Sequence, residues 1–275
     1  SLNVYPNLPG TTDSLWMVYN DTTLADTFRF HALHDISRKL IYSNTDSAIV
    51  LAKKLERESL LAGEDKWKGN ACILQGVAYK LKEQNDSAIA SLNRGIPSLE
   101  NAQHIQGLAA TYTNLGSVYQ RLGDYRTSIE FHLKSLALHE QKGDKKAQAT
   151  VLTNIGLVYF DTKDFKLSLE YQERSLASAE AANDPAMIGR ALGNAGIIYE
   201  QTGDYQRALE LQLEALELRN GVGNWKDIGV NTNNIGVVYQ RLKQYDKALE
   251  FLKRGEKICD SIGYENGRAN AFGSM

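Results

Sequence analysis

Four asparagines in one register are the residues of this chain best suited to bind another molecule. They are Asn114, Asn154, Asn194 and Asn234, spaced 40 residues apart. A side-chain amide both donates and accepts hydrogen bonds, so each could hold the backbone of an extended peptide. Asparagine is a mediocre helix former, so its recurrence indicates a role. A structural alternative stays open, in which duplication copied the residue and it bonds a neighbouring helix.

Other side chains with chemical potential lack the companions that catalysis or metal binding requires. The histidine pairs 31/34 and 132/139 have helical spacings but no third ligand at a metal-site spacing. The run Gly221-Val222-Gly223 is similar to half of a phosphate loop, but it follows a helical pattern, not a strand. No G-x-S-x-G or H-E-x-x-H motif occurs. We therefore expect no enzymatic activity, no bound metal and no cofactor.

Charge and hydropathy exclude two further classes of partner. The chain has 31 basic and 33 acidic residues and a net charge of −2. A nucleic-acid binder would need clustered Lys and Arg to neutralise phosphates, so we expect no nucleic-acid partner. No apolar run approaches the roughly 18 residues that a membrane span needs, so we expect no direct membrane insertion of this region.

A 40-residue repeat carries these residues. Glycines recur at positions 76, 116, 156, 196 and 236, each within a pattern of the form Leu115-Gly116-Ser117-Val118-Tyr119. A second small residue follows 12 positions later in every case, as Ala88, Ser128, Ser168, Ala208 and Ala248. One period earlier, the pattern predicts a further unit centred on residue 36, with Ala48 as its small residue.

Each unit has the pattern of two amphipathic helices. Apolar residues recur at three- and four-residue steps on both sides of a break such as Gly123-Asp124, where glycine ends one helix and aspartate caps the next. Gly116 and Ser128 are small where the two helices must approach closely. Pro97 falls inside a predicted second helix and predicts a kink or an early end there.

Paired helices with L-G-x-x-Y in the first and a small residue in the second resemble tetratricopeptide repeats, over roughly residues 30 to 262. The period exceeds the usual 34, which predicts helices longer by about a turn. Such long repeats are similar to those of Pins-type polarity adaptors, kinesin light chains and bacterial peptide-sensing regulators. The resemblance implies an all-α fold, a right-handed α-solenoid of about six helix hairpins plus a partial seventh.

Three segments follow from this reading. Residues 1–25 form a partly irregular N-terminal lead, and residues 26–263 form the solenoid, with units centred on 36, 76, 116, 156, 196 and 236. We expect residues 264–275 to be the start of a truncated seventh repeat, because Phe272-Gly273 follows an asparagine as in earlier units. Its apolar end carries no polar cap, so we expect possible weak self-association through the C-terminal end.

The resemblance implies that first helices line a concave groove, and this locates the candidate binding residues. They are Asn114, Asn154, Asn194, Asn234, Arg121, Leu157, Phe160, Arg190, Ile197, Glu200, Val237 and Arg241. Chaperone-docking relatives hold a terminal carboxylate with lysines, but Thr113, Thr153, Gly193 and Asn233 occupy the comparable places. The ligand we expect is therefore an internal or amphipathic segment, with acidic residues near Arg121, Arg190 or Arg241.

Two functions remain open. One is a non-catalytic peptide- or protein-binding scaffold that forms the sensor or regulatory region of a larger bacterial signal-transduction protein, such as a histidine kinase, cyclase or regulator. The lead from Thr12 to Thr27 resembles the opening of such sensor arms. The other is a free-standing adaptor that binds a partner in its groove. The first implies an extracytoplasmic location and the second a cytoplasmic one.

Overall fold

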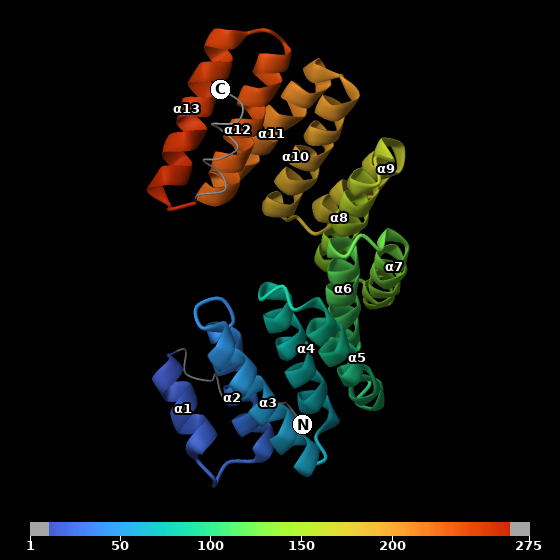
Figure 1. Ribbon diagram of the computed structural model, residues 1–275, viewed down its shortest axis with the longest axis vertical. Helices are drawn as coiled ribbons and strands as arrows, with labels where there is room; N and C mark the ends of the chain where they lie inside the picture. Colours follow the sequence, from blue (N-terminus) through green and yellow to red (C-terminus); the bar gives the residue numbers. More distant parts are fainter. Residues whose placement is uncertain (1–10, 265–275) are drawn as a thin grey trace. The chain divides into compact units, whose positions relative to one another are not determined.

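The computed structural model describes residues 11–264 and places helices on 84% of them, with no strand in that range (Figure 1). This confirms the all-α prediction. The helices of the first part are α1 (Thr12–Asn20), α2 (Asp26–Leu40), α3 (Thr45–Leu61), α4 (Asp65–Leu81), α5 (Asn85–Asn101), α6 (Ile105–Arg121) and α7 (Tyr125–Lys142). Those of the second are α8 (Lys145–Asp161), α9 (Phe165–Ala181), α10 (Pro185–Thr202), α11 (Tyr205–Val222), α12 (Trp225–Arg241) and α13 (Tyr245–Ser261).

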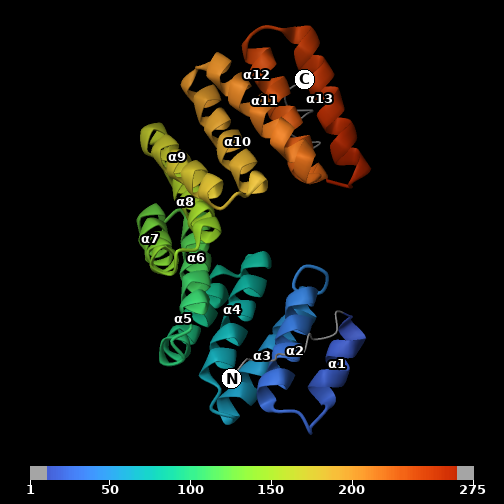
Figure 2. The same cartoon turned by 180° about the vertical axis from the view of Figure 1, so that it is seen from behind.

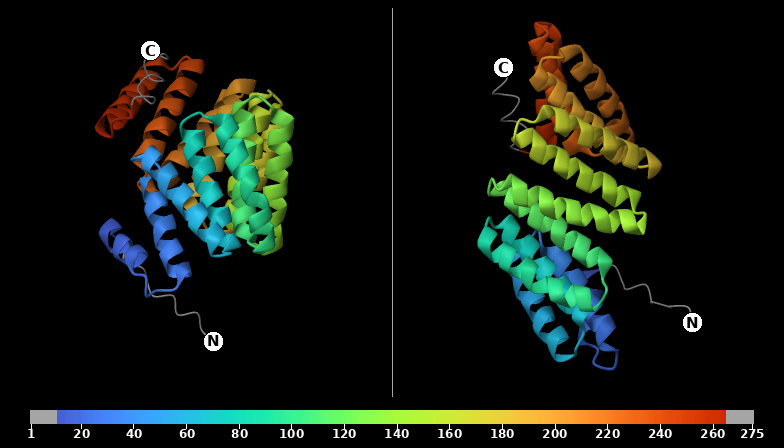
Figure 3. Two further views of the ribbon diagram at one scale, coloured as in Figure 1. Left: turned by 60° about the horizontal axis from the view of Figure 1, so that its bottom comes forward. Right: turned by 90° about the vertical axis from the view of Figure 1, so that its right-hand side faces the viewer.

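The chain divides into two compact units, and we call residues up to Leu138 unit 1 and those from His139 unit 2. Unit 1 contains α1, the hairpins α2/α3 and α4/α5, and α6 paired with the part of α7 up to Leu138. Unit 2 contains α8/α9, α10/α11 and α12/α13. Within each hairpin the two helices lie side by side, as the views from behind and from the side show (Figures 2 and 3).

The recurring glycine exists because the two helices of each hairpin touch at that point. A Cβ added to Gly116 would lie 2.7 Å from His132, and one at Gly156 would lie 2.4 Å from Gln172. The residue 16 positions later covers the glycine in every unit from the second onward, in the pairs Gly76–Leu92, Gly116–His132, Gly156–Gln172, Gly196–Gln212 and Gly236–Leu252. A larger residue than glycine would force the helices apart, as the spacing predicted.

In two of the hairpins the small residue of the second helix is a serine that bonds back to that glycine. The Ser128 hydroxyl donates to the Gly116 carbonyl at 2.8 Å, and Ser168 does the same to Gly156 at 2.8 Å. Both serines are fully buried, so each hydroxyl needs this partner. These two hairpins are therefore held both by close packing and by a hydrogen bond near the same point.

The predicted lead contains a helix of its own. Leu15 and Tyr19 of α1 are buried in a cluster with Phe30 and Trp67. The Tyr19 hydroxyl also donates to Glu58 of α3 at 2.8 Å. The start of the chain that the structure describes is thus packed onto the first hairpin.

Pro97 does not end its helix, since α5 runs on to Asn101. Leu92 and Leu99 lie on either side of the proline and are fully buried. Their burial offsets the hydrogen bond that the proline cannot make. The prediction of an early end was therefore wrong.

None of the helices within residues 11–264 is both long and apolar enough to cross a membrane. The predicted seventh repeat, residues 264–275, and the self-association surface at its end lie outside the described residues except for Tyr264.

Candidate functional site

Four of the candidate binding residues meet at one cavity in unit 2. Leu157 and Phe160 of α8 face Asn194 and Ile197 of α10 across a space of about 80 Å³. Gln172 of α9 completes the lining together with Ser168 and Ile198. Ser168, Gln172 and Asn194 are polar, but the surface that these residues expose to the cavity is almost wholly apolar, so the cavity suits one apolar side chain of a ligand.

Contacts with neighbouring residues position the side chains around this cavity, and the Asn194 amide makes only a weak hydrogen bond there. Phe160 packs edge-to-face on Phe165, with ring centroids 5.7 Å apart. The Gln172 amide donates to the Thr153 carbonyl at 3.3 Å. Asn194 reaches the Gln172 carbonyl oxygen only at 3.5 Å, the outer limit of a hydrogen bond. Asn194 can therefore exchange this weak bond for one to a ligand backbone.

The four asparagines are not equivalent. Asn114 accepts a hydrogen bond from the Lys80 ammonium at 2.7 Å and donates to the Ala110 carbonyl at 2.9 Å. Its amide is used within unit 1, which is the structural role that the sequence left open. Asn154 and Asn234 are half-buried, and their side chains make no hydrogen bond within the part of the chain that the structure describes.

Two of the three predicted arginines already have partners. Arg121, at the end of α6, donates to the Lys80 carbonyl at 2.7 Å. Arg241 ends α12 at the same repeat position, three periods later, and donates to Glu200 at 2.8 Å. The Glu200 side chain is only 10% exposed, so this ion pair connects α10 to α12. Val237 lies half-buried on α12.

Arg190 differs from the other two. Its Nε and Nη2 atoms are buried and have no hydrogen-bond partner in residues 11–264. Burial lowers the pKa of Arg190, and the charges of Asp227 and Asp184 oppose that shift. A buried guanidinium with unpartnered N–H donors can bind an anionic group.

Arg219 of α11 belongs beside Arg190, and the sequence analysis missed it. A Cβ added to Gly193 would lie 2.8 Å from Arg219 Nη2, so the guanidinium covers that glycine of α10. Its Nη1 donates to the Asp227 carbonyl at 3.3 Å. Arg219 is on a second helix, whereas the predicted binding residues are on first helices. Gly189 and Gly193 lie one turn apart on α10, and this spacing was a sign that a side chain from another helix packs there.

Unit 1 has a wider groove of its own, about 410 Å³, between α2, α4 and α6. Residues from all three helices line it, including His34, Arg38, Ile41, Leu74, Val77 and His104. The asparagine register, carried back by one and two periods, falls on Leu74 and His34. The 40-residue register therefore pointed to this groove, but leucine and histidine stand in unit 1 where later repeats have asparagine. No group of three or more metal-ligating residues occurs within residues 11–264.

The repeat period and the hairpin geometry agree with a family model. The tetratricopeptide repeat model matches residues 107–181 and 187–261, more than half of the chain. The chain belongs to the tetratricopeptide repeat family. No curated protein sequence matches it.

Solved structures share the fold at low sequence identity. The apo form of RapI superposes with a TM-score of 0.72 at 17% identity, over 91% of this chain and 70% of RapI. The quorum sensor NprR from B. thuringiensis gives 0.69 at 16% identity, over 90% and 70%. A signal transduction ATPase from Pyrococcus horikoshii with a tetratricopeptide repeat sensor gives 0.66 at 15% identity, over 95% of this chain and 43% of that one.

Proposed function

We propose that this chain is a non-catalytic scaffold that binds a peptide or protein segment, and that unit 2 provides a binding surface on α8, α10 and α12. The carrying observation is the apolar cavity between α8 and α10, where Leu157, Phe160, Asn194 and Ile197 meet. An apolar recess beside an available amide can take a side chain and hold the adjoining backbone.

The structural neighbours support this assignment. NprR has also been solved in complex with its cognate peptide NprX, and that structure superposes on this chain with a TM-score of 0.61 at 17% identity. A repeat fold of this kind presents an extended surface to its ligand. The residues that form such a surface in this chain are those of its own first helices.

The larger context that we propose is the sensor or regulatory region of a bacterial signal-transduction protein. The Pyrococcus horikoshii ATPase, of whose chain this one spans 43%, carries its repeats as a sensor. The sequence that flanks these residues in the gene distinguishes this context from a free-standing adaptor. An output module, with or without a membrane helix, supports the sensor, and a gene that ends with the repeats supports the adaptor.

The binding function can be tested without a known ligand. A phage-displayed library of random decapeptides is selected on the full chain, and the affinity of the selected peptides is measured by fluorescence anisotropy. We expect Leu157→Lys to weaken binding at least tenfold, because the ammonium fills the apolar cavity. Leu213→Lys is the matched control, since Leu157 and Leu213 are 37% and 39% exposed but Leu213 lies on a second helix.

The control should change the affinity by less than twofold. If the two variants bind equally well, the cavity is not the binding site. If no peptide is enriched on the wild-type chain, the proposed function itself fails.

A further inference from the structure

Two arginine side chains lie beside the first half of α10, and neither forms an ion pair with a carboxylate within residues 11–264. Arg190 projects from α10 with buried Nε and Nη2 atoms that bond nothing within residues 11–264. Arg219 comes from α11 and lies against Gly189 and Gly193 of α10. Its one printed bond to the protein is the 3.3 Å contact with the Asp227 carbonyl. Together they leave several N–H donors unused in one place.

The acids nearest to this pair are engaged elsewhere. The Asp184 carboxylate forms a 2.7 Å ion pair with Lys146 and caps α10 by accepting from the Met187 N–H at 3.1 Å. The Asp227 carboxylate accepts from the Asn224 amide at 2.9 Å and lies at an exposed position. Neither forms an ion pair with Arg190 or Arg219 in the described chain.

Two partly buried guanidiniums so arranged are unfavourable in the isolated protein. Burial lowers the pKa of Arg219, Asp227 opposes that shift, and the charge of Arg190 adds to it, so the two cations are near enough to repel. Buried N–H donors without partners destabilise the folded chain. An anion within hydrogen-bond reach of both guanidiniums would offset that cost. Asp227 balances one of the two charges, so the place suits a single negative charge.

The pair lies on the same helix face as the cavity. Arg190, Asn194 and Ile197 occupy positions i, i+4 and i+7 of α10, and the last two line the cavity. At a rise of about 1.5 Å per residue, Arg190 and Ile197 are about 10 Å apart along the helix. An extended peptide covers that distance in about three residues.

We propose that Arg190 and Arg219 bind a carboxylate of the peptide ligand, about three residues from an apolar side chain that occupies the cavity. The inference rests on the proposed function and specifies its ligand chemistry. A carboxylate is planar and carries one charge, and it matches the fork of a guanidinium. It can belong to an Asp or Glu side chain or to the C-terminus of the peptide.

The test uses decapeptides selected by display on the full chain. Each selected peptide is resynthesised with its acidic side chain changed to the amide, and separately with a C-terminal carboxamide. Affinities are measured for the wild type, Arg190→Gln and Arg219→Gln. Arg207→Gln is the control, because Arg207 of α11 is exposed and pairs with Glu210 at 2.9 Å. Circular dichroism checks that each variant is folded.

We expect selected peptides to carry an acid about three residues from a bulky apolar residue. Arg190→Gln should weaken them at least tenfold, Arg219→Gln at least threefold, and Arg207→Gln less than twofold. Whichever amide substitution removes the recognised carboxylate should cost the wild type about tenfold and cost Arg190→Gln less than threefold. That loss of coupling identifies the carboxylate as the group bound.

One outcome overturns the inference but leaves the proposed function standing. Peptides whose binding is abolished by Leu157→Lys but unchanged by Arg190→Gln and by both amide substitutions would show a cavity without an anion site. Peptides insensitive to Leu157→Lys would instead contradict the proposed function itself.

Discussion

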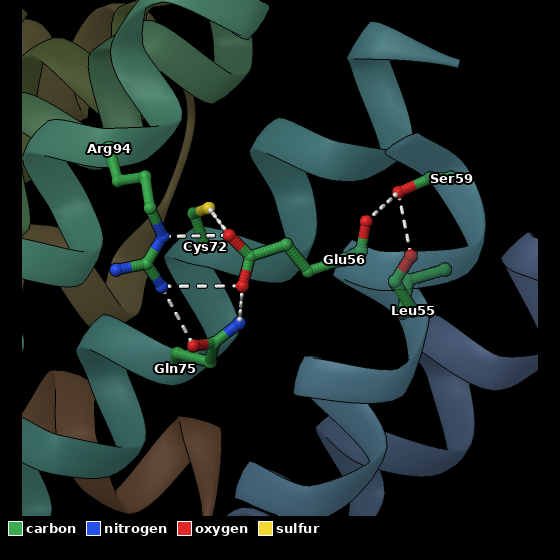
Figure 4. A network of polar contacts seen from close by, with 6 residues as sticks. All are labelled: Leu55, Glu56, Ser59, Cys72, Gln75 and Arg94. Atoms are coloured by element: carbon green, nitrogen blue, oxygen red, sulfur yellow. Dashed lines mark hydrogen bonds and ion pairs between the residues drawn. The ribbon is translucent and has the colours of Figure 1, made fainter. Parts of the chain in front are cut away.

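Arg94 in unit 1 is an exposed arginine and Arg190 in unit 2 is half-buried, and the two differ most in their hydrogen-bond partners. Arg94 of α5 donates from Nε to one oxygen of Glu56 at 2.7 Å and from Nη2 to the other at 3.3 Å (Figure 4). Nη2 also donates to the Gln75 carbonyl oxygen at 3.0 Å. The corresponding donors of Arg190 have no acceptor within residues 11–264.

The environment of Glu56 explains why the Arg94 network is complete. Glu56 also accepts from the Gln75 amide at 2.7 Å and from the Cys72 thiol at 3.4 Å (Figure 4). Burial opposes ionisation of Glu56, but the bonds from Arg94 and Gln75 outweigh it and lower its pKa. Burial, with the Glu56 charge, raises the pKa of Cys72 to about 12. The Nε and Nη2 donors of Arg94 are thus satisfied by side chains of unit 1, whereas Nε and Nη2 of Arg190 have no partner within residues 11–264.

His132 sharpens the contrast, because it is buried and unpartnered but neutral. Both ring nitrogens lack a hydrogen-bond partner within residues 11–264, and burial, with the Lys80 charge, lowers its pKa from 6.5 to about 4. The unfolded chain therefore takes up a proton first, so stability is lost as the pH falls from about 6.5 to 4. This corresponds to about 3 kcal/mol for the full shift.

We expect His132→Leu to remove that pH dependence, because leucine covers the same glycine in the units of Leu92 and Leu252. Urea unfolding from pH 7 to pH 4 would measure it. A wild type and a variant that lose stability in parallel would show that His132 is not the titrating group.

Breaking the complete network should destabilise unit 1. Arg94→Met leaves the Glu56 carboxylate, 19% exposed, without its guanidinium. We expect a loss of about 2 kcal/mol in urea unfolding at pH 7, the cost of stranding a buried acceptor. The loss should shrink as the pH falls through the lowered pKa of Glu56, since a protonated carboxyl no longer needs the cation.

Arg126→Met is the control for this change, because Arg126 is 91% exposed in its pair with Glu130. It should alter the stability by less than about 0.5 kcal/mol. Equal losses in the two variants would contradict the role given to the Glu56 network.

The asparagines divide in the same way between the two units. Asn154→Ala combined with Asn194→Ala should weaken peptide binding about tenfold, since two hydrogen bonds to a ligand are lost. Asn114→Ala should change affinity less than threefold but lower stability, because it leaves the Lys80 ammonium without its acceptor. Unchanged affinity in the double variant would show that Asn154 and Asn194 do not bind the peptide.

The smallest expected effect has the opposite sign. Arg190→Met should raise the stability of the unliganded chain by about 1 kcal/mol, because a buried, unpaired charge is replaced by an apolar side chain. Thermal unfolding by circular dichroism measures it, with Arg94→Met beside it. Destabilisation by both substitutions would show that Arg190 has a partner in the folded chain after all.

Much of the fold could be predicted because the 40-residue period records packing that every hairpin repeats. Gly116 and Ser128 indicated a close approach, and the structure shows both the contact and the bond. The early end expected at Pro97 was wrong, because the local rule took no account of the buried leucines around the proline. A contact that every hairpin makes, such as the one at the glycine, appears as a repeated residue type in the sequence. The burial of leucines beside a single proline produces no such repeat.

The candidate site was less predictable for the same reason. Leu157, Phe160, Asn194 and Ile197 were found because they follow the repeat register, and the structure places them at one cavity. Arg219 was not found, because it reaches α10 from another helix and its equivalents differ between units. The partners of Arg121 and Arg241 depend on side-chain directions that a linear pattern does not contain.

Each recurring glycine leaves a recess that the residue 16 positions later fills, and that residue can be of different types. Leucine fills it in the units of Gly76 and Gly236, and glutamine fills it in those of Gly156 and Gly196. Gln172 and Gln212 do more than fill, since they bond to Asn194 and Asn231 of the next hairpin. Exchange between leucine and glutamine at such a position therefore removes or adds a hydrogen bond between neighbouring hairpins, while the close approach of the two helices within the hairpin is kept.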